Sequence, residues 1–160
     1  MSDLEPKLEK VFRMEAILAE GYPVDASSQI VEVTGGVVLG CGRFEGAKGD
    51  IIAPSGDWLS VSPRGTFQLD VRASVRMPDG IILITYLGRA TPSPEVATRM
   101  QAGETIHRKD ISFMTNPVMK TASQEYAWVN DHIFIGAMSE FSFAQPGKPG
   151  HIYYDVYCAT

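Results

Sequence analysis

Two charged residues lie two positions apart in the stretch LDVR: Asp70 and Arg72. On a β-strand, residues at this spacing point to the same side, so the carboxylate and the guanidinium would lie close together. Facing solvent, they would form a surface ion pair without a role in chemistry. Facing an enclosed pocket, Asp70 could act as a general base, and Arg72 could bind a carboxylate or a developing enolate.

A second group of reactive side chains occurs in residues 126–136. If this segment is a strand, Tyr126, Trp128, Asn130 and His132 share one face. One interpretation is an aromatic plug with satisfied polar tips. We favour a ligand pocket, because stacking rings next to hydrogen-bonding groups are typical of such sites. Tyr126 would then be an acid or hydrogen-bond donor, Asn130 would steady an oxyanion, Trp128 would form a wall, and His132 would be a further acid–base group.

Three more residues have both a structural and a functional interpretation. Asp57 follows the turn residues of PSGD and most simply caps that turn, with Trp58 in the core. Alternatively, Asp57 stands at the mouth of the pocket and Trp58 forms one of its walls. Tyr86 could donate a hydrogen bond to a substrate oxygen, although such a tyrosine is more often part of the core.

Several kinds of chemistry are disfavoured by the sequence. His107, His132 and His151 lack the spacing of metal ligands, so we expect no metal. The glycine-rich stretches precede no helix, and the sequence contains no nucleophile elbow, so we expect no nucleotide cofactor and no serine hydrolase.

Charge and hydropathy limit the partners and the compartment. The net charge of −5 with scattered Lys and Arg argues against nucleic acid. The longest apolar run, residues 81–84, is too short to cross a membrane, and the start, MSDLEPKLEK, lacks the apolar core of a signal peptide. Cys41 and Cys158 match no redox or metal spacing. We therefore expect a cytoplasmic protein without a membrane partner.

Period-two alternation dominates the elements that must position these side chains. Residues 66–77 alternate strictly, and a turn at 78–80 returns the chain, which predicts a long hairpin over 66–88. Further strands are predicted at 30–33, 37–44, 50–53, 58–61, 111–115, 126–136 and 152–157, separated by turns that include 34–36 and 54–57. The segment 8–20 suits a helix by composition and a strand by alternation, and we favour a strand. One helix is predicted over 93–102, with Ser93 as its N-cap.

Many short strands predict a sandwich or a barrel. In order and spacing, Gly35-Gly36, GRFEG at 42–46, SGDW at 55–58, LDVR at 69–72 and YAWVN at 126–130 resemble a bacterial family known as domain of unknown function 3237. Its members resemble the cup-shaped barrels of allene oxide cyclases. The resemblance implies an all-β fold: a single, closed or nearly closed antiparallel barrel over residues 1–160 with one short surface helix. It also places LDVR in the barrel wall, which favours a luminal Asp70 and Arg72.

These observations predict a cofactor-independent enzyme of the isomerase, cyclase or lyase type. It would act by acid–base catalysis on a small apolar or aromatic carbonyl compound inside the barrel. The alternatives are a barrel that only binds or carries a small hydrophobic ligand, and a structural subunit with a filled interior. Strongly perturbed luminal carboxylates would favour catalysis.

The assembly is predicted from the same assignment of faces. If the polar faces line the lumen, the aliphatic faces lie outside and must be covered. We therefore expect a homo-oligomer, with a dimer favoured. Its interface would contain Ala127, Val129, Ile133 and Ile135 together with Phe67, Leu69, Val71 and Val75.

Overall fold

The alternating segment forms the long hairpin that its pattern predicts. Strand β5 (Phe67–Met77) pairs with β6 (Gly80–Ala90) without a register shift, from Phe67 opposite Ala90 to Met77 opposite Gly80. The apolar side chains of β5 from Leu69 to Met77 are buried and Phe67 is partly buried, while Asp70, Arg72 and Arg76 are exposed. The hairpin is therefore one wall of a structure that has an apolar inside.

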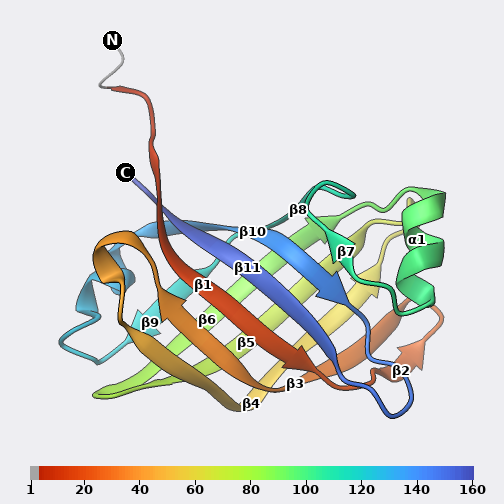
Figure 1. Cartoon of the computed structure of the whole chain (residues 1–160), viewed down its shortest axis with the longest axis horizontal. Helices are drawn as coiled ribbons and strands as arrows, with labels where there is room; N and C mark the ends of the chain where they lie inside the picture. Colours follow the sequence, from red (N-terminus) through yellow and green to blue (C-terminus); the bar gives the residue numbers. More distant parts are fainter. Residues whose placement is uncertain (1–3) are drawn as a thin grey trace.

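The other walls complete a closed antiparallel barrel, which confirms the predicted fold class (Figure 1). The computed structural model describes residues 4–160, so the first three residues of the predicted domain lie outside it. Eight strands form the ring in the order β1, β11, β10, β8, β6, β5, β4 and β3, and β3 pairs again with β1. The remaining elements are β1 (Leu8–Leu18), β2 (Tyr22–Asp25), β3 (Ser28–Gly40), η2 (Gly42–Phe44), β4 (Lys48–Val61), α1 (Pro94–Gln101), β7 (Ile106–His107), β8 (Phe113–Thr115), β9 (Val118–Thr121), η3 (Ala127–Asp131), β10 (Ile133–Ser142) and β11 (Gly150–Ala159).

Two predicted turns are irregularities inside long strands. The turns expected at 34–36 and 54–57 are wrong, because β3 and β4 each run through these positions with a register shift. Such bulges let a long strand bend around a barrel. At Gly36 the backbone has a φ of 131°, and a Cβ would overlap the backbone of Glu15, so this position requires glycine where β3 closes on β1.

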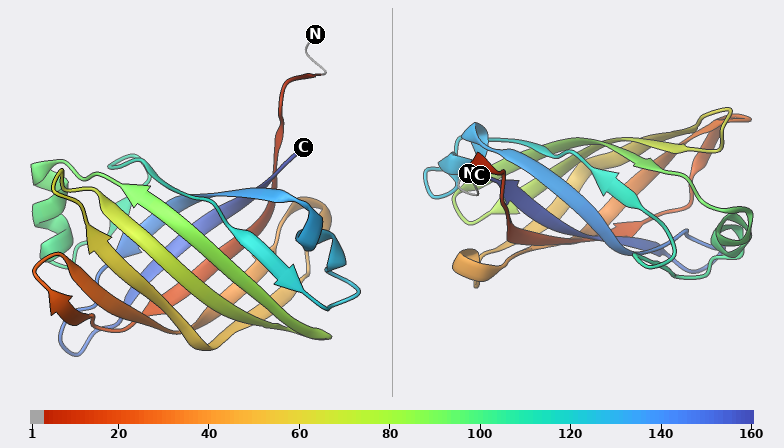
Figure 2. Two further views of the ribbon diagram at one scale, coloured as in Figure 1. Left: turned by 180° about the vertical axis from the view of Figure 1, so that it is seen from behind. Right: turned by 90° about the horizontal axis from the view of Figure 1, so that it is seen from above.

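The N-terminal segment and the helix are as predicted. Residues Leu8–Leu18 form β1, so the sheet context outweighs the helical composition. Helix α1 begins after Ser93, whose Oγ accepts a hydrogen bond from Val96 N at 3.2 Å. Figures 1 and 2 show α1 at one end of the barrel and the short helical turn η3 at the other. We call these the α1 end and the η3 end.

The segment 126–136 is not the strand that its alternation predicts. Residues Ala127–Asp131 form a 3-10 helix, and β10 begins at Ile133. The Asn130 side chain holds this turn: its Oδ1 accepts from Thr121 N, and its Nδ2 donates to Thr121 O and Ala127 O, all within 3.0 Å. These bonds to β9 replace the strand pairing that the sequence pattern led us to expect.

For the long hairpin, the assignment of inside and outside is the reverse of the prediction. Leu69, Val71 and Val75 are buried in the lumen, whereas Asp70 and Arg72 are exposed on the outer wall. Burying the aliphatic faces removes more apolar surface from water than burying a face with charges. The predicted interface is therefore wrong for Leu69, Val71, Val75 and Val129, which are buried, whereas Ala127 and Ile133 are exposed as it required. The homo-oligomer remains a prediction, without most of the surface on which it was argued.

Candidate functional site

The lumen contains a narrow cavity in its α1 half. The cavity has a volume of about 40 Å³. Its walls come from all eight strands of the ring and from Phe143, which follows β10, and they are mostly aliphatic and aromatic. The lining residues are Leu18, Val31, Val33, Asp57, Leu59, Phe67, Leu69, Val71, Tyr86, Phe113, Phe141, Phe143, Ile152 and Tyr154. Three polar groups therefore face one small apolar space, namely those of Asp57, Tyr86 and Tyr154.

Strand register brings these three groups to one level of the barrel. Asp57 on β4 is opposite Val71 on β5, and Val71 is opposite Tyr86 on β6, so the three are lateral neighbours. Tyr154 lies on β11, between Met14 and Met138 of the neighbouring strands. The rings of Tyr86 and Tyr154 meet edge to face across the lumen, with centroids 5.5 Å apart.

Asp57 has the carboxyl group with the clearest shift towards neutral pH. Its Oδ1 accepts a hydrogen bond from Asp70 N at 3.0 Å, which holds the side chain against β5. Burial raises the pKa of Asp57 to about 6. The hydrogen bond from Asp70 N opposes this rise, and the negative charge of Asp70 adds to it. A carboxylate with such a pKa is largely ionised at neutral pH and is still basic enough to take a proton.

The two tyrosines have the opposite chemical character. Burial, followed by the nearby carboxylate of Asp57, raises the pKa of Tyr86 far above its ordinary value. Burial also raises the pKa of Tyr154 strongly, with smaller effects from Tyr86 and Asp57. Both phenols therefore keep their protons and remain hydrogen-bond donors.

The hydroxyl of Tyr154 is buried without a hydrogen bond of regular geometry. Tyr154 is 2% exposed, and within residues 4–160 no acceptor meets its Oη at hydrogen-bonding distance and angle, although the Tyr86 hydroxyl is near enough to affect its pKa. A buried polar group without a partner costs free energy, so it is a position where a ligand oxygen would be stabilised. Together, Asp57 can move a proton while Tyr154 and Tyr86 donate to a developing oxyanion.

Of the residues singled out in the sequence, Asp57 and Tyr86 reach this cavity. The expectation that Asp57 caps a turn is wrong, because it lies within β4 and faces the lumen. The luminal positions expected for Asp70 and Arg72 are also wrong, since both side chains are more than half exposed and their closest charged atoms are 4.0 Å apart. Trp58 is exposed next to them, with the Arg72 guanidinium 5.6 Å from its ring centroid.

The predicted group at 126–132 lies at the η3 end and does not line the luminal cavity, although Tyr126 and Trp128 border an open groove on the surface there. Trp128 stacks on Phe44 with ring centroids 4.5 Å apart and also contacts Phe12, which makes it part of an aromatic plug. Tyr126 is buried, with its backbone N–H bonded to a serine hydroxyl. His132 is exposed, and its Nδ1 lies 2.7 Å from Trp128 O. Asn130 is committed to the turn described above. The plug interpretation matches these contacts better than the pocket.

Tyr154 is the residue of the cavity that sequence reasoning missed. It lies in the predicted strand 152–157, where Ile152, Tyr154 and Val156 alternate with more polar residues. This alternation was the available signal: a tyrosine on the apolar face of a barrel strand points inward. Its pairing with Asp57 and Tyr86 has no signal in the sequence, because it depends on the register of several strands.

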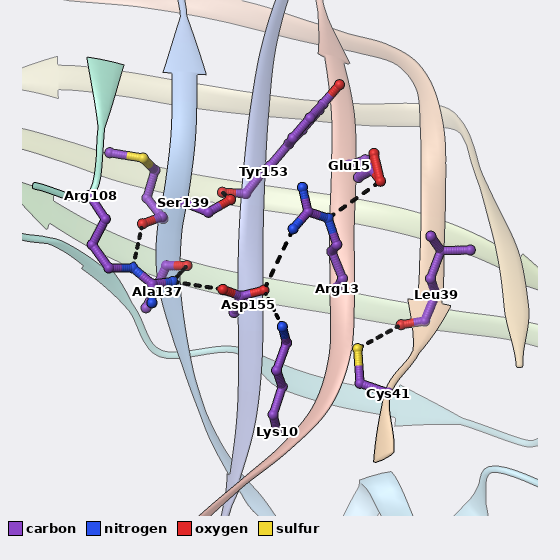
Figure 3. A network of polar contacts seen from close by, with 11 residues as sticks. Lys10, Arg13, Glu15, Leu39, Cys41, Arg108, Ala137, Ser139, Tyr153 and Asp155 are labelled. Atoms are coloured by element: carbon purple, nitrogen blue, oxygen red, sulfur yellow. Dashed lines mark hydrogen bonds and ion pairs between the residues drawn. The ribbon is translucent and has the colours of Figure 1, made fainter. Parts of the chain in front are cut away.

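The densest group of charges lies on the outer wall and joins three strands (Figure 3). Asp155 on β11 pairs with Lys10 Nζ at 2.9 Å and with Arg108 Nη2 at 2.8 Å, and Arg13 Nη1 lies 4.0 Å away. Burial alone would raise the pKa of Asp155, but the bonds and charges of Lys10 and Arg108 together lower it. Arg108 also donates to two carbonyls of β10, so the group acts as a clamp between strands.

A serine, a histidine and a glutamate on the outer wall are linked by a series of hydrogen bonds. Ser142 Oγ lies 3.0 Å from His151 Nδ1, and His151 Nε2 lies 3.1 Å from Glu140 Oε2. The order resembles a hydrolytic triad. Ser142 is only 5% exposed, however, so a substrate cannot reach its hydroxyl. We therefore interpret these hydrogen bonds as a structural link between β10 and β11.

Two further features of residues 4–160 concern metals and membranes. In this part of the chain, no three His, Cys, Asp or Glu side chains are grouped closely enough to hold a metal ion. The same residues contain no helix of the length and hydropathy needed to span a bilayer.

Comparison with known proteins gives the family and its fold. A UPF0311 protein of Clostridium acetobutylicum is 31% identical over 109 residues, which cover 67% of this chain and 66% of the relative. The crystal structure of a protein of unknown function from Rhodopseudomonas palustris has a TM-score of 0.81 at 21% identity, with 98% of each chain covered. An enzyme from Penicillium herquei has a TM-score of 0.65 at 18% identity, with 97% of this chain and 95% of that chain covered. Residues 6–158 match the family described as "Protein of unknown function (DUF3237)", and the chain therefore belongs to this family.

Proposed function

We propose that the protein is a cofactor-independent acid–base enzyme that acts on a small, uncharged carbonyl compound in the α1 half of the lumen. The observation that carries this proposal is the raised pKa of Asp57 beside two protonated phenols in an apolar cavity. Perturbed carboxyl groups in enclosed sites are more frequent in active sites than in simple binding pockets. The catalytic role thus passes from Asp70 and Arg72 on the outer wall to Asp57.

The reaction is a proton transfer next to a carbonyl group. The Asp57 carboxylate accepts a proton from the carbon adjacent to the carbonyl, and the electrons of that C–H bond form an enolate. The enolate oxygen accepts a hydrogen bond from Tyr154 Oη, with Tyr86 as a second donor. If the protonated Asp57 returns a proton to the same carbon, the substrate is re-formed and only proton exchange results. If the enolate is conjugated and the proton goes to another carbon, the double bond moves, which is an isomerisation without any redox change.

The apolar walls support both the chemistry and the choice of substrate. Phe113 packs edge to face against Tyr154 at 6.1 Å, and further aromatic rings surround the same space. In such surroundings a hydrogen bond to a developing charge is stronger than in water. The similarity in fold to the Penicillium herquei enzyme agrees with a catalytic barrel, although the identity of 18% supports only the fold.

A non-catalytic carrier is the second candidate. The observation that favours it is the lining itself, because all but three of the fourteen side chains at the cavity are apolar. In that case Asp57 and Tyr154 would only orient a ligand. Proton exchange distinguishes the two functions, since a carrier gives no rate enhancement.

The test needs no knowledge of the natural substrate. Acetone and 2-butanone, which are small enough for the cavity, are incubated with the protein in D₂O, and the loss of the protons next to the carbonyl is followed by ¹H NMR. We expect the wild-type protein to accelerate exchange, and Asp57→Asn to reduce the protein-dependent rate by roughly 100-fold or more. Tyr154→Phe removes one oxyanion donor, so we expect a loss of the same order.

Asp50→Asn is the matched control, because it changes the same functional group at an exposed position of the same strand, β4. We expect it to keep the wild-type exchange rate. Full exchange by Asp57→Asn would refute the assigned base. If a ketone binds to the wild-type protein but its protons exchange no faster than in buffer, the protein is better described as a carrier.

A further inference from the structure

The cavity borders a groove on the outside of the barrel. This groove has a volume of about 300 Å³ and lies at the α1 end, where it is lined by residues near the end of β1, by Met100 of α1 and by the loop that follows β10. Leu18, Val31 and Phe143 line both the cavity and the groove. These three side chains therefore form the boundary between the inside and the outside.

Phe143 is the one of the three that is placed to move. Leu18 and Val31 are buried and belong to the paired strands β1 and β3. Phe143 is only partly buried and follows β10, whose pairing with β11 ends at Ser142. Its ring is held by edge-to-face contacts, 4.7 Å from Phe141 and 6.2 Å from Phe67 between centroids. A rotation of this ring breaks side-chain contacts only.

The size of the cavity shows why such a movement matters. A cavity needs roughly 10–15 Å³ to hold one water molecule, so a cavity of about 40 Å³ has room for a few atoms and not for a whole ring or chain. A larger ligand must therefore place its polar head at Asp57 and Tyr154 and pass Phe143 with the rest. The groove beyond Phe143 is large enough to receive it.

The charges along this route select against anions. Asp57 is the only ionisable carboxyl group among the cavity residues, and these residues include no Lys or Arg. The groove adds the carboxylate of Glu20 and three glutamine side chains. A ligand carboxylate would lose its hydration without gaining a cationic partner, and it would meet two acidic groups.

We propose that Phe143 determines the length and width of the ligand, and that the substrate class is a neutral carbonyl compound with an apolar tail that extends past Phe143 into the groove. This inference rests on the proposed function for the placement of the polar head. The passage past Phe143 does not depend on whether Asp57 catalyses a reaction.

The experiment measures the dissociation constants of 2-butanone, 2-hexanone, 2-octanone and the anion octanoate by ligand-observed NMR. For the wild-type protein we expect affinity to increase by about threefold for each added methylene that enters the groove. We expect octanoate to bind at least about tenfold more weakly than 2-octanone. Phe143→Trp narrows the passage, so it should weaken 2-octanone selectively and leave 2-butanone unchanged.

Phe143→Ala should admit wider ligands, and acetophenone should bind at least about tenfold more tightly than to the wild-type protein. Phe44→Ala removes a partly buried ring at the η3 end and serves as the matched control, with an unchanged ligand profile. Identical profiles for the wild-type and both Phe143 variants would overturn the inference, as would equal binding of octanoate and 2-octanone. If Asp57→Asn binds the ketone series normally and also keeps full proton exchange, the proposed catalysis fails while the role of Phe143 stands.

Discussion

The two halves of the barrel lumen are formed by strands with the same alternation of side chains, but the side chains fill one half and leave a cavity in the other. In the η3 half, side chains such as Val75, Ile84 and Phe134 fill the space and are almost completely buried. Beyond them, the stacked rings of Phe44 and Trp128 cover the end. In the α1 half, the strands continue with the same alternation, but the side chains leave a cavity and the polar groups of Asp57, Tyr86 and Tyr154.

The difference shows that a small barrel can separate stability from function along its axis. The filled half supplies the dense apolar packing that holds the strands together. The hollow half contains a carboxyl group that is costly to bury, together with an unpaired hydroxyl. Each half should therefore respond differently to the same substitution.

The largest effect on the free energy of unfolding is expected when an asparagine replaces a buried valine in each half of the lumen. Val71 and Val75 lie on the same face of β5, the first at the cavity and the second in the filled half. Val75→Asn buries an amide among aliphatic side chains and should lower the free energy of unfolding by about 4 kcal/mol. Val71→Asn can direct its amide to the cavity and its polar groups, so we expect a loss of about 2 kcal/mol. Urea unfolding measures both values, and equal losses would remove the distinction between the halves.

The next effect concerns the carboxyl group in the hollow half. The pKa of Asp57 is about 6 in the folded protein, above the value of about 3.9 in an unfolded chain. Well below pH 4, Asp57 is protonated in both the folded and the unfolded state, so its ionisation does not change the free energy of unfolding. As the pH rises from about 4 to about 6, the unfolded state ionises first, so the wild-type protein loses on the order of 3 kcal/mol of stability.

Asp57→Asn cannot ionise and should not show this loss. The stability difference between wild type and variant, measured by urea unfolding from pH 4 to pH 7, should therefore shift in favour of the variant. A difference that stays constant over this range would show that Asp57 is not held in an unfavourable environment. The same variant is expected to lose proton exchange, so stability and activity would change in opposite directions.

A smaller effect of opposite sign is expected for the aspartate on the outer wall. The pKa of Asp155 is lowered in the folded protein by Lys10 and Arg108 against the effect of burial, so its ionised form stabilises the fold. Asp155→Asn should lower the free energy of unfolding by about 2 kcal/mol at pH 7. This contribution is present above the unfolded-state pKa and is lost as the pH falls through the folded-state pKa. As the pH rises from 4 to 7, stability relative to the wild-type protein should therefore increase for Asp57→Asn and decrease for Asp155→Asn, and a change of the same sign in both variants would contradict one of the two assignments.

Much of the architecture was accessible from local sequence patterns. The strict alternation of residues 66–77 determines a strand, and Ser93 with Pro94 determines the start of α1. The period-two alternation did not predict the turn at residues 127–131, because their backbone follows the bonds of the Asn130 side chain to Thr121, nine residues earlier, which a strand pattern does not reveal. The turns predicted at 34–36 and 54–57 failed for a related reason: glycine and proline mark irregular backbone, and they do not distinguish a bulge from a turn.

The candidate site was predicted only in part. Asp57 and Tyr86 were identified, but Asp57 was interpreted mainly as a turn cap, and the catalytic role was given to Asp70 and Arg72. The two faces of β5 can be read from its sequence, but their assignment to lumen or solvent requires the energetic balance of the closed barrel. That balance places Leu69, Val71 and Val75 inside and the charges outside.

The sequence by itself determined the strand periodicity, the helix caps and the membership of a barrel family, because these depend on residues close together in the chain. Only the tertiary structure decided that Asp57, Tyr86 and Tyr154 share one level of the lumen. These residues lie on β4, β6 and β11, and their proximity is set by bulges and by the register of hydrogen bonds between strands. The pKa of Asp57 depends on the same closure, since burial by distant strands is what raises it.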